Sequence, residues 1–464
     1  MSKLESLPGD LVTFLSGGTP SKSNKDYWNG EIPWISASSM QSTRYHDSDL
    51  RVTSLGSTNG TRLVPAETVL LLVRGGALHN KIPVGITTRE VTFNQDVKAL
   101  VPKSEDITPY YLLAWLISSR ELLLGKVENT GIGAGKLDTK ILQDLDVPVP
   151  PKAELLRLEL FSKALDDKII LNQNINHTLE QMAQALFKSW FVDFEPVKAK
   201  MAVLEAGGSQ EDATLAAMAA ISGKDAYALA VFEREHPEQY AELKTTAELF
   251  PSAMQDSELG EIPEGWSIKP LDGIATYQNG LALQKFRPEN ENDFLPVVKI
   301  AQLKKGFSDG EEKASPNIKP ECIIDNGDVV FSWSGSLMVD IWCGGKAALN
   351  QHLFKVSSTK YPKWLYYKYT AHHLIEFQRI AEAKAVTMGH IKREHLSQAK
   401  CLMPSSETVH AFTPFFEPVL NKVISNRLET RKLENIRDTL LPKLLSGEIT
   451  LPEAEQAVSE VENV

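Results

Sequence analysis

Cysteine is scarce in this sequence of 464 residues, and long apolar runs are absent from it. Cys322, Cys343 and Cys401 lie far apart, so they form neither a disulfide framework nor a C-x-x-C zinc motif. No apolar run reaches the about 18 residues that a membrane-spanning helix needs. The first residues also lack the apolar stretch of a secretory signal. We therefore expect a reduced, cytoplasmic protein.

Signatures of catalysis are missing too. The sequence holds no phosphate-binding G-x-x-x-x-G-K-[ST] motif, and Gly131-Ile-Gly-Ala-Gly135 is a weak substitute because it follows an expected helix rather than a strand. His372 and His373 are adjacent, so they point to different faces of a helix and do not suit one metal ion. We expect neither a catalytic residue nor a metal site in this chain.

The net charge of −11 is distributed unevenly. Residues 195–265 hold 5 basic and 14 acidic residues, and residues 450–464 hold four glutamates and no basic residue. The rest of the chain is slightly positive, and residues 266–404 alone carry 18 basic against 14 acidic residues. Contact with phosphates is therefore permitted outside the two acidic segments.

The sequence repeats itself. Gly135 recurs as Gly389, 254 positions later, and Asn94-Gln95 recurs as Asn350-Gln351. Four further identities share the offset of 254: Lys168, Ile170, Asn172 and Leu179 with Lys422, Ile424, Asn426 and Leu433. The order of these matches indicates two copies of one plan, a globular part of about 150 residues followed by a long helix.

Each globular part has mixed α+β character. Residues 69–73 and 329–333 are typical of buried strands that run into glycine turns. Helices are expected to begin near Pro109 and Pro362, because proline is favoured in the first turn. Short strands and long loops account for the remainder.

Two long helices carry apolar residues at three- and four-residue steps, with Asn172 and Asn426 at equivalent positions. Two such seams can be buried against each other, and a buried asparagine fixes the register. The alternative is two ordinary amphipathic helices, each facing its own domain. About 40 helical residues span about 60 Å.

These patterns divide the chain into six segments. The spacer is acidic and alanine-rich, and we expect short surface helices there. The segments are 1–150 (first globular part), 151–194 (long helix), 195–265 (spacer), 266–404 (second globular part), 405–449 (long helix) and 450–464 (acidic tail).

Four stretches of the sequence resemble the specificity subunit of type I restriction–modification enzymes. They are Ser16-Gly-Gly-Thr-Pro-Ser21, Tyr27-Trp-Asn-Gly-Glu-Ile-Pro-Trp-Ile-Ser36, Leu186-Phe-Lys-Ser-Trp-Phe-Val-Asp-Phe194 and Leu440-Leu-Pro-Lys-Leu-Leu-Ser-Gly-Glu-Ile449. The second copy departs from the first: Asn279-Gly280 stands for Gly17-Gly-Thr-Pro20, and Leu295-Pro-Val297 for Pro33-Trp-Ile35.

This resemblance implies two target-recognition domains that read the halves of a split duplex DNA target. It implies a pseudo-twofold arrangement in which the long helices pair as an antiparallel coiled coil and set the separation of the halves. Two methyltransferase subunits and two restriction/translocase subunits are the implied partners. No cofactor is implied for this chain, since S-adenosylmethionine would be bound by the methyltransferase, and ATP and Mg by the restriction subunit.

Base reading needs paired donors and acceptors, and serine and threonine mostly position phosphates. The candidates in the first copy are Thr19, Ser21, Lys22, Ser23, Lys25, Ser36, Arg74, Asn80, Lys81, Asn94 and Gln95. Those in the second are Gln284, Lys285, Arg287, Lys299, Gln302, Lys304, Lys305, Trp333, Ser334, Ser336, Asn350 and Gln351.

Arg74 is the best single candidate because it directly follows an apolar strand and sits in a glycine turn. For any single candidate, the alternative is a solvated polar loop. For the repeated Asn-Gln pairs, a shared structural hydrogen bond is an equal alternative.

Apolar clusters close both long helices. They are Trp190, Phe191 and Phe194 in the first, and Leu441, Leu444 and Leu445 in the second. Such clusters form either a docking face for a partner subunit or the packing between helix ends. The sequence leaves both interpretations open.

The leading hypothesis is a non-catalytic subunit that recognises a bipartite DNA sequence. One alternative is a stand-alone DNA methyltransferase, which the missing Asp/Asn-Pro-Pro-Tyr/Phe signature of amino-methyltransferases disfavours. Another is a coiled-coil scaffold that never touches DNA.

Overall fold

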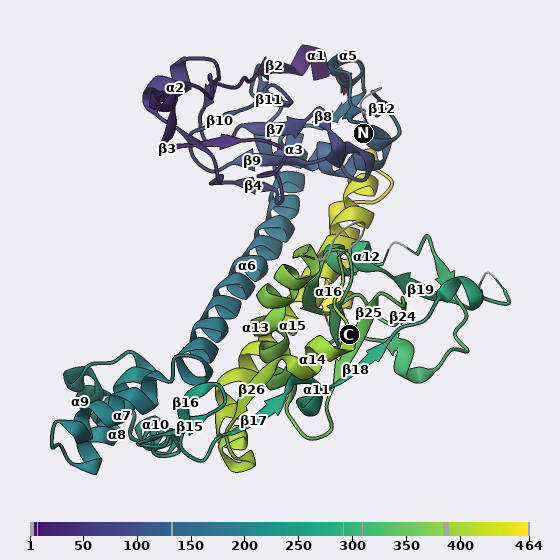
Figure 1. Cartoon of the computed structure of the whole chain (residues 1–464). Helices are drawn as coiled ribbons and strands as arrows, with labels where there is room; N and C mark the ends of the chain where they lie inside the picture. Colours follow the sequence, from purple (N-terminus) through teal and green to yellow (C-terminus); the bar gives the residue numbers. More distant parts are fainter. Residues whose placement is uncertain are drawn as a thin grey trace. The chain divides into compact units, whose positions relative to one another are not determined.

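The computed structural model describes residues 4–6, 8–130, 133–290, 292–308, 310–383 and 389–462. The chain divides into two compact units (Figure 1). Unit 1 comprises Met1–Gln173 and Glu429–Val464, and unit 2 comprises Asn174–Leu428. Each unit therefore contains one globular part together with a portion of each long helix.

The globular part of unit 1 is built on two main sheets. The first has the order β2 (Val12–Ser16), β11 (Val97–Pro102), β7 (Val69–Leu72), β9 (Val84–Thr87) and β4 (Arg44–Tyr45). The second has the order β5 (Arg51–Val52), β3 (Trp28–Ile35), β10 (Val91–Phe93) and β6 (Leu63–Val64). Strands β3 and β10 run parallel, with Ile35 opposite Phe93.

Smaller elements complete this part. They are the strands β1 (Leu4–Ser6), β8 (Arg74–Gly75), β12 (Glu128–Asn129), β13 (Gly135–Lys136) and β14 (Val147–Val149), the helices α1 (Pro8–Leu11), α2 (Ser54–Thr58), α4 (Arg120–Leu124) and α5 (Thr139–Gln143), and the 3-10 turns η1 (Lys25–Tyr27) and η2 (Gly76–His79).

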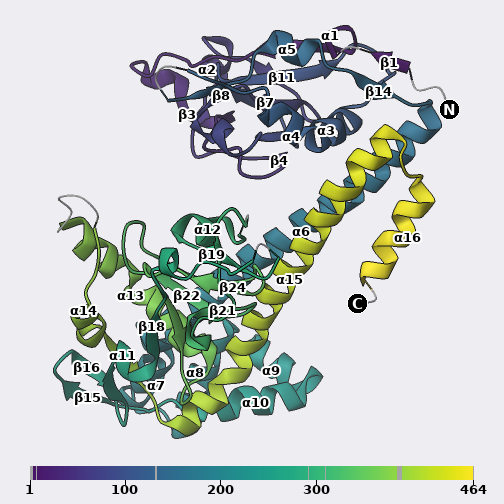
Figure 2. The ribbon, with the colours of Figure 1, turned by 90° about the vertical axis from the view of Figure 1, so that its right-hand side faces the viewer.

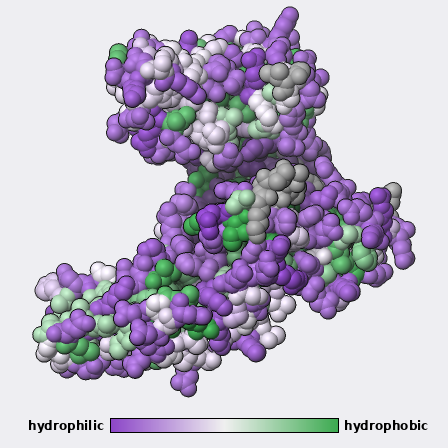
Figure 3. All heavy atoms as spheres, viewed as in Figure 1, coloured by the Kyte–Doolittle hydropathy of each residue, from purple (hydrophilic) through white to green (hydrophobic). Residues whose placement is uncertain are grey.

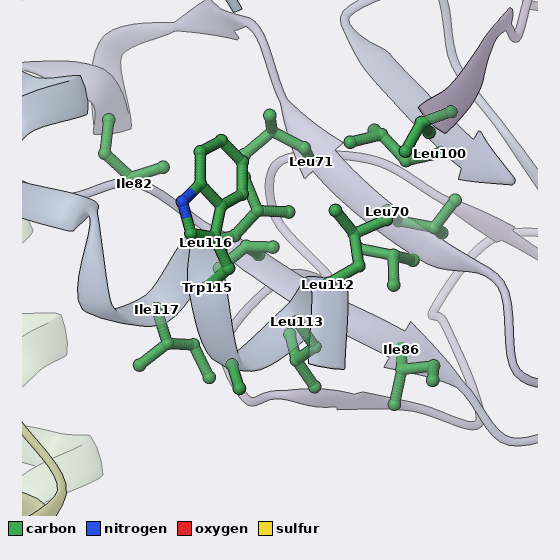
Figure 4. Packing of buried hydrophobic residues seen from close by; sticks show 14 of the residues in the cluster. Leu70, Leu71, Ile82, Ile86, Leu100, Leu112, Leu113, Trp115, Leu116 and Ile117 are labelled. Carbon is green, nitrogen blue, oxygen red and sulfur yellow. The ribbon is translucent and has the colours of Figure 1, made fainter. Parts of the chain in front are cut away.

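Helix α3 (Pro109–Ser118) closes the core of unit 1. The Thr108 hydroxyl accepts a hydrogen bond from the Tyr111 N–H at 3.1 Å, and Pro109 takes the first helical position, as the sequence predicts. Strand β7 is fully buried, as predicted. Figure 4 shows the leucines of α3 facing Leu70 and Leu71 of this strand.

Unit 2 repeats this plan. One sheet has the order β18 (Thr276–Asn279), β25 (Leu353–Ser357), β22 (Val329–Ser332) and β23 (Met338–Ile341). The other has the order β20 (Lys313–Ala314), β19 (Leu295–Val298), β24 (Ala347–Leu349) and β21 (Ile323–Ile324). Strand β17 (Ser267–Pro270) pairs with β26 (Lys400–Met403).

The helices of this part include α13 (Lys363–Ala383), which begins directly after the expected Pro362. The others are α11 (Leu271–Ile274), α12 (Ile300–Lys305) and α14 (Arg393–Gln398), with 3-10 turns η3 (Leu283–Lys285) and η4 (Pro320–Cys322).

Matching hydrogen bonds align the two copies. The Asn94 N–H donates to the Ile35 carbonyl at 3.0 Å, as the Asn350 N–H does to the Val298 carbonyl at 3.1 Å. Val298 therefore corresponds to Ile35, so Pro296 corresponds to Pro33. This corrects by one position the alignment expected from the sequence, which placed Leu295 against Pro33.

The long helices α6 (Lys152–Phe191) and α15 (Ser406–Ser446) contact each other inside each unit (Figure 2). In unit 1, Asn172 Nδ2 donates to Glu429 Oε2 at 2.8 Å. In unit 2, Asn426 Nδ2 donates to Asn176 Oδ1 at 2.9 Å. The predicted seam asparagines, Asn172 and Asn426, are both buried.

The contacts within each unit give the direction of the two helices. In unit 1, Lys168 pairs with Glu429 while Asp166, earlier on α6, pairs with Arg437, later on α15. The helices therefore run antiparallel there.

The spacer forms a helical bundle of its own, followed by a hairpin. Its helices are α7 (Glu195–Glu205), α8 (Gln210–Ser222), α9 (Ala226–Glu235) and α10 (Pro237–Glu248), and its hairpin is β15 (Met254–Ser257) with β16 (Gly260–Pro263). A small core that includes Met218, Leu229 and Leu243 holds α8, α9 and α10 together. Figure 3 shows apolar atoms on the surface of this bundle as well. The helices agree with the expectation for this segment.

Within the described residues, no single helix has the length and apolar character needed to cross a membrane, and α8 with α9 meets that test only as a pair bent by 86°.

The segment expected as an acidic tail contains a helix, α16 (Leu451–Glu462). Helix α15 ends at Ser446, and Gly447 adopts a positive φ of 79° that ends the helix at low steric cost. Ala454 of α16 is fully buried in the core of unit 1. The apolar residues of this segment explain why α16 packs into unit 1, although the acidic residues were what drew attention in the sequence.

Candidate nucleic-acid interface

Polar side chains gather in unit 1 where the parallel strands β3 and β10 end. Ser36 follows β3, and Asn94 with Gln95 follows β10. The Gly17–Gly18 backbone lies against this point: the Gly18 N–H donates to the Phe93 carbonyl at 2.9 Å, and a Cβ on Gly17 would lie 2.2 Å from the same oxygen. Only glycine permits that approach.

The close approach brings the predicted loop residues together. Thr19 Oγ1 donates to Gln95 Oε1 at 2.7 Å, so the loop after β2 and the loop after β10 form one polar surface. We call the surface formed by Thr19, Ser36, Arg74 and Gln95 the first loop surface.

Arg74 belongs to this surface because β7, the strand that precedes it, ends beside the turn after β10. The Val73 N–H donates to the Asp96 carbonyl at 2.8 Å, which joins the end of β7 to the turn after β10. Arg74 is exposed, and its guanidinium makes no hydrogen bond or ion pair with any residue that the structure describes. It therefore offers five free donors in the fork geometry that suits phosphate or guanine.

Unit 2 builds the same arrangement. Lys299 follows β19, and Asn350 with Gln351 follows β24. A Cβ on Gly280 would lie 2.2 Å from the Leu349 carbonyl oxygen, so Gly280 takes the place of Gly17. We call the surface formed by Lys299, Trp333, Gln351 and His352 the second loop surface.

The counterpart of Arg74 differs in chemistry. Ser334 holds that position, is 3% exposed, and bonds to His352 Nδ1 at 3.0 Å. Trp333 Nε1 donates to the Gln351 carbonyl at 3.2 Å. Ser334 therefore holds its neighbours in place, and the sequence prediction of a DNA contact at Ser334 is not supported by its burial.

His352 was not singled out from the sequence. It occupies the place of Asp96 in the first copy, directly after the repeated Asn-Gln pair. The neighbouring pair is the signal that could have identified it. Lys304 and Ser336, both predicted, are exposed, and Lys304 Nζ donates to Ser336 Oγ at 2.9 Å.

The repeated asparagines have a structural role. Asn94 Oδ1 accepts from the Asp96 N–H at 3.1 Å, and Asn350 Oδ1 accepts from the His352 N–H at 3.2 Å. Both asparagines are buried. Of the two interpretations left open by the sequence, the geometry supports the shared structural hydrogen bond for asparagine, while the adjacent Gln95 and Gln351 stay exposed.

The remaining candidates are polar residues of loops, 3-10 turns and helix α12. Lys81 Nζ donates to Gln41 Oε1 at 3.2 Å, Gln302 Oε1 accepts from the Lys299 N–H at 3.2 Å, and Lys299 forms an ion pair with Glu312. Ser21 Oγ and Ser23 Oγ lie 2.8 Å apart. The residues that are exposed to solvent are Ser21, Lys22, Ser23, Lys25, Asn80, Gln284, Lys285, Arg287 and Lys305.

The six apolar residues at the helix ends lie in the interior. Trp190, Phe191 and Phe194 are buried in the core of unit 2, and Leu441, Leu444 and Leu445 in the core of unit 1. Trp190 contacts Phe250 and Phe412 with ring centroids 5.3 and 4.7 Å apart. Of the two interpretations that the sequence left open, their burial supports core packing and not an exposed docking face.

The two adjacent histidines also serve packing. His373 Nε2 lies 3.0 Å from the Lys400 carbonyl oxygen, and burial lowers the pKa of His373 to about 4. In the part of the chain that the structure describes, no group of three or more His, Cys, Asp or Glu side chains is placed to hold a metal ion.

Comparison with known proteins finds the type I restriction modification DNA specificity domain twice in this chain, over residues 7–181 and 263–436. The type I restriction enzyme HindI specificity subunit of Haemophilus influenzae is 30% identical over 362 residues, which cover 75% of this chain and 79% of that one. The MjaIX specificity subunit of Methanocaldococcus jannaschii is 24% identical over 458 residues, with 96% and 93% covered.

Among solved structures, the S subunit of a type I restriction-modification system from M. genitalium superimposes with a TM-score of 0.48 at 11% identity, covering 96% of each chain. The two domain matches span most of the sequence and follow its internal repeat. The chain belongs to the family of type I restriction–modification DNA specificity subunits.

Proposed function

We propose that this chain reads an asymmetric, bipartite duplex DNA target, one half with each loop surface, and has no catalytic activity of its own. The observation that carries this proposal is the duplicated loop surface at the ends of parallel strands. The two surfaces present different side chains, Arg74 with Gln95 in one and Trp333 with Gln351 in the other. Different side chains favour different bases, so the two half-sites should differ.

In this proposal the exposed lysines and arginines of the same loops contact phosphates and set the register on the duplex. These are Lys22 and Lys25 in the first copy, and Lys285, Arg287, Lys304 and Lys305 in the second. Arg74 and the two exposed glutamines supply base contacts. Each bidentate base contact contributes about 1–3 kcal/mol of discrimination.

The paired helices would act as the spacer. Helix α6 has 40 residues and α15 has 41, lengths of about 60 Å at 1.5 Å per residue. We infer that they form one antiparallel coiled coil that holds the two recognition domains at a fixed separation. The antiparallel contacts of Lys168, Asp166 and Asn176 within the units support this inference.

Other chains would carry out the chemistry. We propose that two methyltransferase subunits bind S-adenosylmethionine and modify the target, and that two restriction/translocase subunits use ATP and Mg. Membership of the specificity-subunit family supports these partners. The α7–α10 bundle lies between the two domain matches, and it is not assigned a role in this proposal.

Methylome mapping tests the proposal. Methylated adenines are mapped in host DNA with the gene present and with the gene deleted. We expect one split motif with a constant unread gap to lose its methylation in the deletion strain. An unchanged methylome in a strain whose methyltransferase partner is expressed would contradict the proposal.

Binding of S-adenosylmethionine to the purified chain separates this function from a stand-alone methyltransferase. Calorimetry should detect no binding at millimolar ligand. Stoichiometric binding would favour the methyltransferase alternative. A footprint with two protected patches in the assembled complex would exclude a scaffold that never touches DNA.

A further inference from the structure

A buried carboxylate in unit 1 joins three elements. Asp166 on α6 is 3% exposed and accepts hydrogen bonds from Thr43 Oγ1 at 2.8 Å and from the Arg44 guanidinium of β4. Arg437 on α15 approaches the same carboxylate at 3.7 Å. One side chain thus holds the recognition domain and both long helices.

Unit 2 contains a second three-way contact with the roles exchanged. Arg427 on α15 donates from Nη1 to Asp340 Oδ1 at 2.7 Å and from Nη2 to Glu180 Oε1 at 2.9 Å. Asp340 belongs to β23 of the recognition domain, and Glu180 to α6. Arg427 Nη1 also donates to the Ile341 carbonyl at 3.1 Å.

The two contacts occupy corresponding places. By the offset of 254, Arg427 corresponds to Gln173, which lies one heptad beyond Asp166 on the same helix face. In the sheets, Asp340 pairs with Val330 as Gly85 pairs with Leu70.

Unit 1 cannot carry an aspartate at that position, because a Cβ on Gly85 would lie 2.8 Å from the backbone of Thr43, which directly precedes β4, the strand paired with β9. Arg44 of β4 supplies the charge instead. The sign of the contact is therefore reversed: the recognition domain contributes a cation in unit 1 and an anion in unit 2.

We propose that Asp166 and Arg427 are positioning residues, which fix each recognition domain to the helix pair, and that their opposite polarity matches each domain to its own end of that pair. The inference rests on the proposed function for its consequence at DNA. A domain joined to both helices through one shared ionic contact keeps its loop surface at one angle to the helices. The unread gap in the target then has one permitted length.

The first test measures gap discrimination. Full-length chain in complex with its methyltransferase partner binds duplexes whose half-sites are separated by the native gap or by one base pair more or less. In Asp166→Asn and Arg427→Gln variants, preference for the native gap should fall by about fivefold or more, the size of a coupled polar contact. Binding to a single half-site should change less than about twofold, since no base contact is altered.

Matched controls carry the same chemical change outside the three-way contacts. Asp256→Asn removes an exposed carboxylate of β15, and Arg379→Gln removes an exposed arginine of α13. Both should keep the wild-type preference. Unchanged preference in Asp166→Asn and Arg427→Gln would overturn the positioning role. Loss of single half-site binding in step with stability would also overturn it, because it would indicate a purely structural role.

The second test examines polarity and needs no DNA. Arg44→Asp gives unit 1 the domain charge of unit 2 against an unchanged Asp166, whereas Arg44→Met only removes the charge. Hydrogen exchange at β4 should be faster in Arg44→Asp than in Arg44→Met, because like charges are then buried together. Equal rates of hydrogen exchange at β4 in the two variants would overturn the proposal that opposite charges match each domain to its own end of the helix pair. Wild-type complex that binds no split duplex would instead contradict the proposed function, so the two failures are distinguishable.

Discussion

At the scale of single residues, the proposed contact with DNA depends most on the guanidinium of Arg74. Its neighbours are held by backbone hydrogen bonds to Asp96 and by the pairing of β8 with β13. The side chain itself is exposed and makes no polar contact with a described residue. Binding to DNA would therefore cost Arg74 no existing interaction within the described part of the chain.

Arg74→Ala should weaken binding to duplexes that carry the first half-site by about 1–3 kcal/mol if the arginine reads a base. If it contacts a phosphate, the loss should be uniform across sequences, and the salt dependence should flatten by about one unit. Fluorescence titration at several salt concentrations distinguishes the two cases. Arg234→Ala, an exposed arginine of the α7–α10 bundle, serves as the control. Wild-type affinity in Arg74→Ala would contradict the assignment.

Substitutions at Asn94 and Gln95 should have different effects, the first on the stability of the fold and the second on DNA binding. Asn94→Ala leaves the half-buried Asp96 N–H without its side-chain acceptor, at a cost of about 1–3 kcal/mol in the free energy of unfolding. Gln95→Ala should change that free energy by less than about 0.5 kcal/mol because the side chain is exposed, yet it should weaken DNA binding. Urea unfolding and DNA titration measure the two effects. The opposite pattern would indicate that Asn94 contacts a base.

Residue types and neighbours identified the loops but not the direction of each side chain. Arg74 and Ser334 both follow buried strands, and only their environments distinguish them: Ser334 packs beside His352. The repeated asparagines show the same limit, because a hydrogen bond to a backbone N–H two residues on depends on the turn that the chain adopts. The burial of a side chain and the geometry of its hydrogen-bond partners decide such cases, and the spacing of residues in the sequence predicts neither.

At the scale of elements, the apolar ends of the long helices pack into the two cores, which is one of the two interpretations that the sequence left open. Phe187, Trp190 and Phe191 of α6 correspond to Leu441, Leu444 and Leu445 of α15. Each set fills the core of the unit that holds the other copy's globular part. The sequence predicted the helices and their apolar ends, but which surface those ends meet depends on the antiparallel contact between the helices.

Helix α13 carries a pH-sensitive element. Burial lowers the pKa of His373 to about 4, below the ordinary value of about 6.5, so the folded protein prefers the neutral ring. Its contribution to stability is complete above about pH 6.5 and is lost as the pH falls from there to about 4, by on the order of 1–3 kcal/mol.

His373→Gln keeps a donor near the Lys400 carbonyl and does not titrate. The free energy of unfolding should therefore depend less steeply on pH between about 6.5 and 4 than in the wild type, as urea unfolding at stepped pH would measure. Some dependence should remain, because burial also lowers the pKa of His372. His177→Gln, at an exposed position of α6, should retain the wild-type slope. A wild-type slope in His373→Gln would refute the prediction.

At the scale of the whole molecule, each compact unit combines one recognition domain with parts of both long helices. The repeat predicted two copies of one plan, and it could not show that each copy is completed by the helix of the other. That arrangement depends on contacts between residues about 250 positions apart, such as Asn176 with Asn426. Under the proposed function, helix length is the variable that sets the separation between the two halves of the target.

The most direct test of this account is to measure the length of the unread gap in the DNA target after both long helices have been lengthened. One heptad is inserted after Gln173 and another after Leu428, which keeps both seams in register and adds about 10 Å. Methylation mapping should show the same two half-sites with a gap about three base pairs longer, at 3.4 Å per pair. An insertion in α6 alone should abolish methylation. The native gap in the doubly lengthened protein would contradict the account.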